Sequence, residues 1–229
     1  MKIHRFYYPH NIPEGIHALV DVDIVHQIRN VLRLEPGETL ELFDGNGHTY
    51  TGTVASLSKN SIDIEITNIS LKEKSPRHVA LFVSILKKEN TELAIEKAVE
   101  IGASEIVPII TSRTIKTGLK EERLLSVIKE ATEQSGRTYL PELHEIMKFE
   151  EAILFAKKNF SRVVLFDPRG TPFTAKDESR VAVCVGPEGG FTDEELAFAE
   201  SHEVEVCSLP THILRGETAV IVGVYSALL

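Results

Sequence analysis

Segments within the first 70 residues alternate between apolar and polar positions with a period of two, which is typical of strands that have one buried face. The alternation is clearest in Ser61–Ile69, and Thr39–Phe43 and His48–Leu57 are also strand-like. Asp44–Gly47 and Ser58–Asn60, which separate these segments, have the residue types of hairpin turns. We therefore expect a small antiparallel β domain, and its strand pattern favours a barrel.

One helix is expected within this β-rich part of the chain, at Asp23–Leu34. Ile24, Ile28 and Val31 recur at helical spacing and share one side. Glu35-Pro36-Gly37 follows, and this type of sequence ends a helix.

Beyond residue 77 the pattern changes to apolar runs that alternate with helical periodicity. Buried strands are expected at His78–Leu86, Glu105–Ile110, Arg162–Asp167, Val181–Val185 and Glu205–Leu209. Helices are expected at Thr91–Ile101, Lys120–Ser135 and Phe149–Asn159, after Thr192, and from about Gly216 to the C-terminus. This alternation predicts an α/β domain with a largely parallel sheet that is covered on both faces.

A charged segment, Leu71–Arg77, separates the two patterns and reads as a linker because it contains a proline and little apolar content. The chain therefore divides into a first domain over residues 1–70, a linker over 71–77 and a second domain over 78–229. The linker's charge and proline mark a boundary between separately buried cores.

The composition is that of an ordinary globular chain of 229 residues, with 42% hydrophobic and 26% charged residues. No apolar run approaches the ~18–20 residues of a membrane span, and the N-terminal ten residues lack the apolar core of a secretory signal. Cys184 and Cys207 each fall inside a predicted buried strand, so we expect reduced thiols and a cytoplasmic protein. The formal net charge of −9 argues against a general nucleic-acid coat protein.

Two strand-to-helix loops near the end of the chain are the strongest candidates for a binding site. They lie within Val181–Glu195, VAVCVGPEGGFTDEE, and Leu209–Ala219, LPTHILRGETA. Glycines let backbone approach a ligand closely, and α/β sheets bind ligands beyond the carboxyl ends of their strands. The alternative for GPEGG is a tight turn without a ligand. Neither G-x-G-x-x-G nor G-x-x-x-x-G-K-[ST] occurs, so the sequence lacks the main motif evidence for a Rossmann or a P-loop nucleotide site.

The loop pair, GPEGGFT followed by L-x-x-x-I-L-R-x-E-T-A, resembles the SPOUT superfamily of methyltransferases, in particular the RsmE-type family that methylates uracil N3 in 16S ribosomal RNA. Further family motifs (HRFY, HQIRNVLRL, LFDGNGHTY, EATEQSGRTYLPEL) follow in the family's order, so the resemblance covers nearly the whole chain. It implies a PUA-like RNA-binding β-barrel over residues 1–70 and a SPOUT α/β domain over 78–229 with a C-terminal trefoil knot. It also implies S-adenosyl-L-methionine as cofactor, a homodimer, and small-subunit ribosomal RNA or the assembled subunit as partner.

Three positions depart from the family pattern: Pro210 stands where Gly is usual, His212 where Arg is usual, and Gly216 where Thr is frequent. Because Pro210 has no N–H, one amide that could have faced the cofactor is missing.

Candidate catalytic residues follow from the chemistry of uracil N3, which must lose its proton before it attacks the methyl group. Arg215 is the candidate for stabilising the resulting negative charge, since its guanidinium can bond two oxygens at once. The alternative for Arg215 is a structural pair with a carboxylate. Glu188 and Glu217 are candidate proton acceptors, although helix capping explains both equally well and a helix N-terminus weakens a carboxylate base. Water or a phosphate group is a further candidate acceptor.

Apolar and backbone groups at the strand ends are the candidates for holding the cofactor. They are Leu165, Gly186, Gly189, Gly190, Leu209, Ile213, Leu214 and Thr218. Gly186 and Gly190 are the best supported, because a methyl group there would stand where backbone must come close. For Leu209 and Leu214, ordinary core packing is the competing explanation.

Four arginines are candidates for contacting RNA: Arg5, Arg33, Arg113 and Arg137. A solvated surface role is the alternative for each of them. His4 and His26 also fall in family motifs, but a structural role is favoured for both. No His spacing with supporting ligands occurs, so a metal is not expected.

These observations together predict S-adenosylmethionine-dependent methylation of uracil N3 in 16S ribosomal RNA. One alternative is another SPOUT RNA methyltransferase that acts on a ribose 2′-hydroxyl or on tRNA. The other is a non-catalytic RNA-binding protein on the same scaffold.

Overall fold

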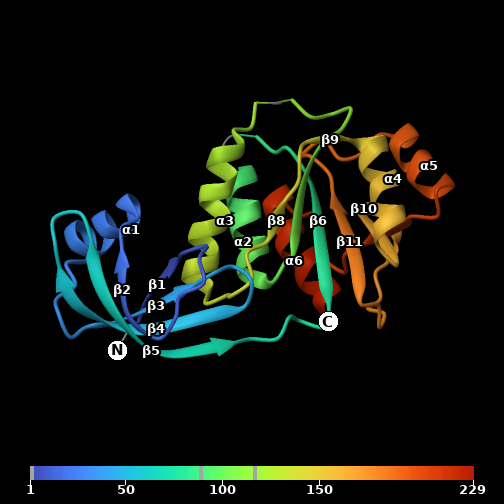
Figure 1. Ribbon diagram of the computed structural model, residues 1–229. Helices are drawn as coiled ribbons and strands as arrows, with labels where there is room; N and C mark the ends of the chain where they lie inside the picture. Colours follow the sequence, from blue (N-terminus) through green and yellow to red (C-terminus); the bar gives the residue numbers. More distant parts are fainter. Residues whose placement is uncertain (1–2, 88–89, 116–117) are drawn as a thin grey trace. The chain divides into compact units, whose positions relative to one another are not determined.

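The computed structural model describes residues 3–87, 90–115 and 118–229 of the chain, which form two units (Figure 1). One unit holds Met1–Lys74 together with Thr132–Leu140, and the other holds Ser75–Ala131 together with Pro141–Leu229. The division expected from the sequence did not include this return of Thr132–Leu140 to the first unit.

The first unit is built on a five-stranded sheet with the order β1-β3-β4-β5-β2. The strands are β1 (His4–Tyr7), β2 (Gly15–Leu19), β3 (Thr39–Phe43), β4 (His48–Leu57) and β5 (Ile62–Leu71). All neighbouring pairs are antiparallel except β1 and β3, which are parallel, so the expectation of an antiparallel domain holds for most of the sheet. β2 was not expected, because most of its side chains are exposed and its hydrophobic pattern is therefore weak.

The helix expected at Asp23–Leu34 is two pieces of different winding. Helix α1 (Val22–His26) begins after Asp21, whose side chain accepts a hydrogen bond from the N–H of Ile24 at 2.9 Å. A π-helical segment, η1 (Gln27–Leu32), continues it and ends at Arg33, whose φ of 56° is left-handed. This left-handed turn ends the helix and sends the chain towards β3.

The second unit is built on a seven-stranded sheet in which every pair of neighbours is parallel, as expected from the sequence. Its order is β12-β10-β11-β6-β7-β8, and β9 also pairs with β7. The strands are β6 (His78–Ser84), β7 (Glu105–Ile110), β8 (Glu142–Leu143), β9 (Met147–Lys148), β10 (Arg162–Pro172), β11 (Arg180–Val185) and β12 (Glu205–Ser208). Only β8 and β9, of two residues each, were not expected, because so short a segment carries no periodicity.

Helices cover both faces of this sheet (Figure 1). They are α2 (Asn90–Ile101), α3 (Glu121–Ser135), α4 (Phe149–Asn159), α5 (Asp193–Ser201) and α6 (Gly216–Leu228). On one face, α4 and α5 share a core with side chains such as Phe82 and Cys184. On the other, α6 lies close enough that a Cβ on Gly223 would meet the ring of Phe166 at 2.9 Å. The sheet is therefore buried on both faces, which explains its nearly continuous apolar strands.

The two cysteines are free and buried, and they lie on strands that β10 separates. Cys184 belongs to β11 and Cys207 to β12, so the thiols are not on neighbouring strands. Burial raises the pKa of Cys184 to about 12, which leaves its thiol protonated and unreactive near neutral pH. Among the described residues, the structure contains no helix with both the length and the apolar character that a membrane span requires.

Candidate functional site

A cavity of about 640 Å³ lies beyond the carboxyl ends of β10, β11 and β12, where the sequence predicted a site. A volume of this size is typical of small-molecule sites. The β11–α5 loop, the segment before α6 and the first turn of α6 supply most of the wall. The lining residues are Asn90, Phe166, Asp167, Pro168, Val185, Gly186, Pro187, Glu188, Gly190, Phe191, Ser208, Leu209, Thr211, His212, Ile213, Leu214, Arg215, Gly216, Glu217 and Ala219.

The β11–α5 loop contains two glycines that are required for different physical reasons. A Cβ on Gly186 would lie 2.9 Å from the ring of Phe191, so the ring occupies the space that a side chain would need. Gly190 has a left-handed φ of 67°, and its missing Cβ would meet only Asp167, at 3.9 Å. The requirement at Gly190 is therefore conformational, not spatial. Thr192 then caps α5, as the sequence predicted.

A charged network holds the cavity wall at the bulge in β10. Asp167 is 4% exposed, and Arg169 donates to its Oδ1 from Nε at 2.7 Å and to its Oδ2 from Nη2 at 2.9 Å. Burial alone would raise the pKa of Asp167, but the hydrogen bonds and charge of Arg169, with a smaller contribution from Arg113, hold it below the ordinary value. Arg169 also reaches Asp193 and the carbonyl of Phe191. Asp167 is therefore an ionised group in the cavity wall.

Arg113, a predicted RNA contact, packs against the same loop. Its Nη1 donates to the carbonyl of Gly189 at 2.6 Å and to that of Phe191 at 3.3 Å. A Cβ on Gly189 would lie 3.2 Å from the Arg113 side chain, so the two are closely packed. Arg113 thus stabilises the loop, and its contact with RNA stays a prediction.

The first turn of α6 brings backbone and a carboxylate to the cavity. Arg215 is the N-cap residue with extended backbone (φ −67°, ψ 155°), and its carbonyl accepts the N–H of Ala219 at 2.8 Å. A Cβ on Gly216 would lie 2.8 Å from the end of the Leu86 side chain, so a larger residue here would require Leu86 to shift. Oε2 of Glu217 is buried and has no hydrogen-bond partner among the described residues. An orphaned acceptor in a cavity wall indicates a donor on the ligand.

The structure brings all three candidate catalytic residues to the cavity: Arg215, Glu188 and Glu217. Arg215 is exposed, and within the described part of the chain no carboxylate forms an ion pair with it. Oε1 of Glu188 accepts the N–H of Lys87 at 2.9 Å, which ties the β11–α5 loop to the segment after β6.

Of the predicted cofactor residues, Gly186, Gly190, Leu209, Ile213 and Leu214 line the cavity. Leu165, Gly189 and Thr218 do not. The side chain of Leu165 is fully buried in the core beneath α4 and α5. Among the positions that depart from the family pattern, His212 lines the cavity and Pro210 does not.

Sequence reasoning missed the β10 side of the site, which Phe166, Asp167 and Pro168 form. The pairing of β10 with β12 shifts register between Phe166 and Thr171, so these residues sit at a bulge. Bulges are common next to active sites because they redirect side chains. The available signal was the position of Asp167 at the carboxyl end of a predicted strand, where ligands bind in such sheets.

The predicted RNA contacts of the first unit lie in different surroundings. Arg5 pairs with Glu41, donates to the carbonyl of Arg137 at 3.2 Å and stacks over the ring of Phe43. Burial lowers the pKa of Arg137 to about 10. Arg33 is exposed at the left-handed end of η1. The geometry therefore leaves Arg33 the most accessible of these three, and all of them stay predictions as RNA contacts.

Comparison with known proteins assigns both parts of the chain to known domain families. Residues 73–227 match the RNA methyltransferase domain, and residues 20–67 match the RNA methyltransferase PUA domain. The fold and the cavity are thus those of an RNA methyltransferase with an N-terminal PUA-like domain.

Relatives narrow this class to one family. Ribosomal RNA small subunit methyltransferase E of Rickettsia conorii is 29% identical over 98% of this chain and 94% of its own length. The protein of the same name from Mesomycoplasma hyopneumoniae is 30% identical over 72% of this chain and 76% of its own. The solved structure of the Neisseria gonorrhoeae protein of that name, bound to S-adenosyl methionine, is similar with a TM-score of 0.88 and 30% identity, covering 97% of this chain and 95% of its own. The chain belongs to the ribosomal RNA small subunit methyltransferase E family.

Proposed function

We propose that the protein transfers a methyl group from S-adenosyl-L-methionine to N3 of a uracil in small-subunit ribosomal RNA. The cavity at the carboxyl edge of the parallel sheet carries this proposal, because it joins the two loops that bear the family motifs. Family membership gives the reaction, and the relative from Neisseria gonorrhoeae binds the same cofactor.

The residues of the cavity fit this cofactor. S-adenosylmethionine supplies an electrophilic methyl group, and its ammonium and ribose hydroxyls are hydrogen-bond donors. Glu217 offers the buried, unpartnered Oε2 that such a donor would satisfy. Phe166, Leu209 and Leu214 offer apolar wall for an adenine ring and a thioether chain.

Arg215 is proposed to stabilise the negative charge that develops on the uracil when N3 loses its proton. Its guanidinium is permanently charged and lines the cavity, and it can bond the carbonyl oxygens beside N3. Glu188 or Glu217 is proposed to accept the proton. Glu188 is exposed but hydrogen-bonded to the backbone of Lys87, whereas Glu217 lies in the first turn of α6, where the helix dipole weakens it as a base. Water or a phosphate group is the remaining acceptor.

The first unit is proposed to supply affinity for RNA, as its match to a PUA domain of RNA methyltransferases suggests. We infer further that its sheet closes into a barrel and that the chain before α6 is threaded as a trefoil knot, both from the family resemblance. A cytoplasmic location follows from the proposed ribosomal substrate.

A homodimer is proposed as the active form. Large apolar side chains stay exposed on and beside α6: Ile213 is 88% exposed, Tyr225 56% and Leu229 66%. A second copy of the chain would cover such a surface. Light scattering coupled to size exclusion tests this, and a monomer at micromolar concentration that methylates RNA at full rate would refute it.

Mass-spectrometric mapping of ribosomal RNA tests the reaction. Ribosomal RNA, assembled small subunits and tRNA, all from cells that lack the gene, are each incubated with the purified protein and cofactor. A new methyl group on the base of one uracil of the small-subunit RNA, at N3, is expected. A methyl group on a ribose or on tRNA would instead favour another SPOUT reaction, and no methylation of any of these RNAs would favour a non-catalytic binding protein.

A further inference from the structure

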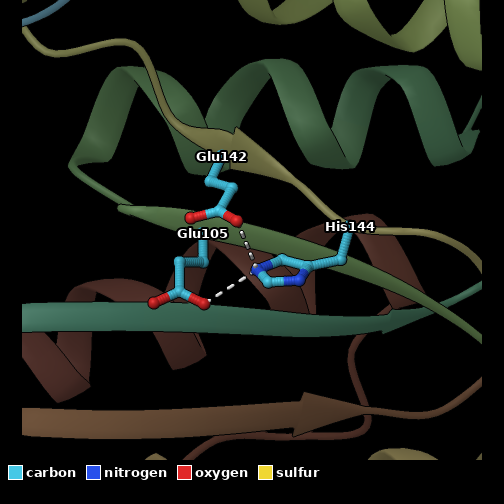
Figure 2. Close-up of side chains that lie close together, drawn as sticks. All are labelled: Glu105, Glu142 and His144. Carbon is cyan, nitrogen blue, oxygen red and sulfur yellow. Dashed lines mark hydrogen bonds and ion pairs between the residues drawn. The ribbon is translucent and has the colours of Figure 1, made fainter.

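A second cluster of chemically active side chains lies at the opposite edge of the sheet, near the amino ends of its strands. Figure 2 shows Glu105, Glu142 and His144 pointing toward one another. Glu105 begins β7 and Glu142 begins β8, and the two residues are paired across these strands. The cofactor cavity lies at the carboxyl ends of the strands instead. The cluster is therefore not part of the site described above.

The backbone fixes the geometry of this cluster. The N–H of His144 donates to the carbonyl of Ile106 at 2.9 Å, which extends the pairing with β7 past the end of β8. Glu142 and His144 are two residues apart along an extended segment, so their side chains leave the same face. The short strand β8 and the residue that follows it thus present two polar side chains, Glu142 and His144, to Glu105.

The three side chains have the spacing of metal ligands. Nε2 of His144 lies 2.9 Å from Oε2 of Glu105 and 3.8 Å from Oε1 of Glu142. All three ligand atoms lie within 4.8 Å of one another. Zinc binds His nitrogen and carboxylate oxygen at about 2.0–2.2 Å, so tetrahedral ligands are roughly 3.3–3.6 Å apart. Shifts of well under 1 Å in each side chain would accommodate the ion.

Further groups orient Glu105 as an outer shell would. Its other oxygen, Oε1, lies 2.5 Å from Nε2 of His78 and 3.3 Å from Nη2 of Arg180. Hydrogen bonds from neighbouring residues fix ligating carboxylates in the same way in known metal sites.

We propose that Glu105, Glu142 and His144 bind one divalent ion of the zinc class. Imidazole with two carboxylates suits zinc and its neighbours, whereas magnesium and calcium prefer oxygen ligands alone. With neutral histidines, the two carboxylates and Arg180 leave a net charge of −1 before the metal enters. For Nε2 of His144 to bind the ion, the neutral ring must carry its single proton on Nδ1, so a proton that lies on Nε2 in the metal-free protein moves to Nδ1 through solvent. The ion links β8 to β7 and stabilises this edge of the sheet.

The sequence could not show this site. The first ligand is 37 positions before the second in the chain (142 minus 105), and only Glu142 and His144 are close in sequence. Two ligands at a spacing of two residues are too common to predict a metal.

Calorimetric titration of the full, chelator-treated chain with ZnCl₂ tests the proposal, with MgCl₂ as the control ion. One equivalent of zinc is expected to bind and to raise the melting temperature through linkage, while magnesium does neither at the same concentration. Glu142→Gln should weaken zinc binding about 10-fold or more, because one charged ligand is lost. The Glu142 side chain is 70% exposed, so this variant should fold normally. His144→Ala should abolish stoichiometric binding.

His202→Ala is the matched control, because His202 follows the last residue of α5 and its ring hydrogen-bonds to Ser201 and to the carbonyl of Phe198, away from the cluster. Its zinc affinity should equal that of the original chain. X-ray absorption at the zinc edge should show one imidazole and oxygen ligands without sulfur. The proposal is wrong if zinc does not bind stoichiometrically, or if Glu142→Gln and His144→Ala bind it as tightly as the control does. In either case the cluster is only a hydrogen-bonded network.

Discussion

Gly190 offers the sharpest test of how the β11–α5 loop is built, because only its backbone conformation requires glycine. Its φ of 67° lies in the left-handed region, and a Cβ there would have no neighbour closer than 3.9 Å. Gly190→Ala therefore creates no clash, and its cost is that of placing an L-residue in this region, about 1–2 kcal/mol. We expect the free energy of unfolding to fall by that amount if the loop keeps its shape.

Two further substitutions at this position separate conformation from side-chain size. Gly190→Asn should recover part of the loss although Asn is larger than Ala, because Asn tolerates left-handed backbone. Gly190→Val should lower the free energy of unfolding more than Gly190→Ala does, because a β-branched residue forces the loop to another shape. It should also abolish the rise in melting temperature that is expected on addition of S-adenosylmethionine. Gly186→Ala is the contrasting variant, since its Cβ would meet the Phe191 ring at 2.9 Å.

Urea unfolding gives the free energies, and calorimetry gives the affinity for S-adenosylmethionine. The slope of the unfolding free energy against urea concentration should be the same for all variants, which shows that their folded and unfolded states remain comparable. If Gly190→Ala is as stable as the original chain, or if Asn costs as much as Val, the argument from φ is refuted.

Three other outcomes follow from the same site. Arg215→Ala should lower turnover by about 10²–10³-fold with nearly unchanged cofactor affinity, and Arg215→Lys should recover only part. If isothermal titration instead shows a large loss of affinity, Arg215 is structural. Glu217→Gln should leave the ligand-free protein as stable or more stable, because a buried, unpartnered charge is removed, yet weaken cofactor binding roughly 10-fold, as the loss of a charged hydrogen bond predicts. Equal affinity by calorimetry would contradict this. Asp167, whose pKa is lowered, stabilises the fold above about pH 4, and this contribution is lost as pH falls through its folded pKa. Acid unfolding of Asp167→Asn should lack that part of the pH dependence.

Long segments with strong periodicity could be predicted from the sequence, and short or exposed ones could not. The strand β7 and the helix α4 begin and end where the pattern placed them, because each buries a continuous face. β2 was missed because its side chains are mostly exposed, with Ile16 at 74%. The pieces α1 and η1 were predicted as one helix, because Ile24 and Ile28 are both buried at helical spacing; the expectation that Val31 shares their side was wrong, since Val31 in the π-helical segment is 62% exposed.

The candidate site divides in the same way. The two loops that follow β11 and β12 could be found because glycine and motif residues mark them. The contribution of β10 was missed: the position of Asp167 at the end of a predicted strand was the only signal, and the bulge beside it depends on pairing with β12. Gly186 illustrates a subtler limit: the sequence suggested close approach of a ligand, whereas the ring of Phe191 already fills the space.

The segment Thr132–Leu140 changes how the RNA-binding role of the first unit should be tested. Its backbone pairs with the β3–β4 turn, where the N–H of Gly47 donates to Thr138 at 3.1 Å and that of Leu140 donates to Gly45 at 3.0 Å. A fragment that starts near Ser75 would expose this segment without its partners, so loss of activity could reflect misfolding alone. Substitution of Arg33 avoids that problem, because its side chain is exposed and its removal leaves these bonds in place. Arg33→Gln should weaken RNA binding in a salt-dependent way without changing cofactor affinity. A variant that methylates RNA at the original rate in both low and high salt would show that Arg33 does not contact RNA.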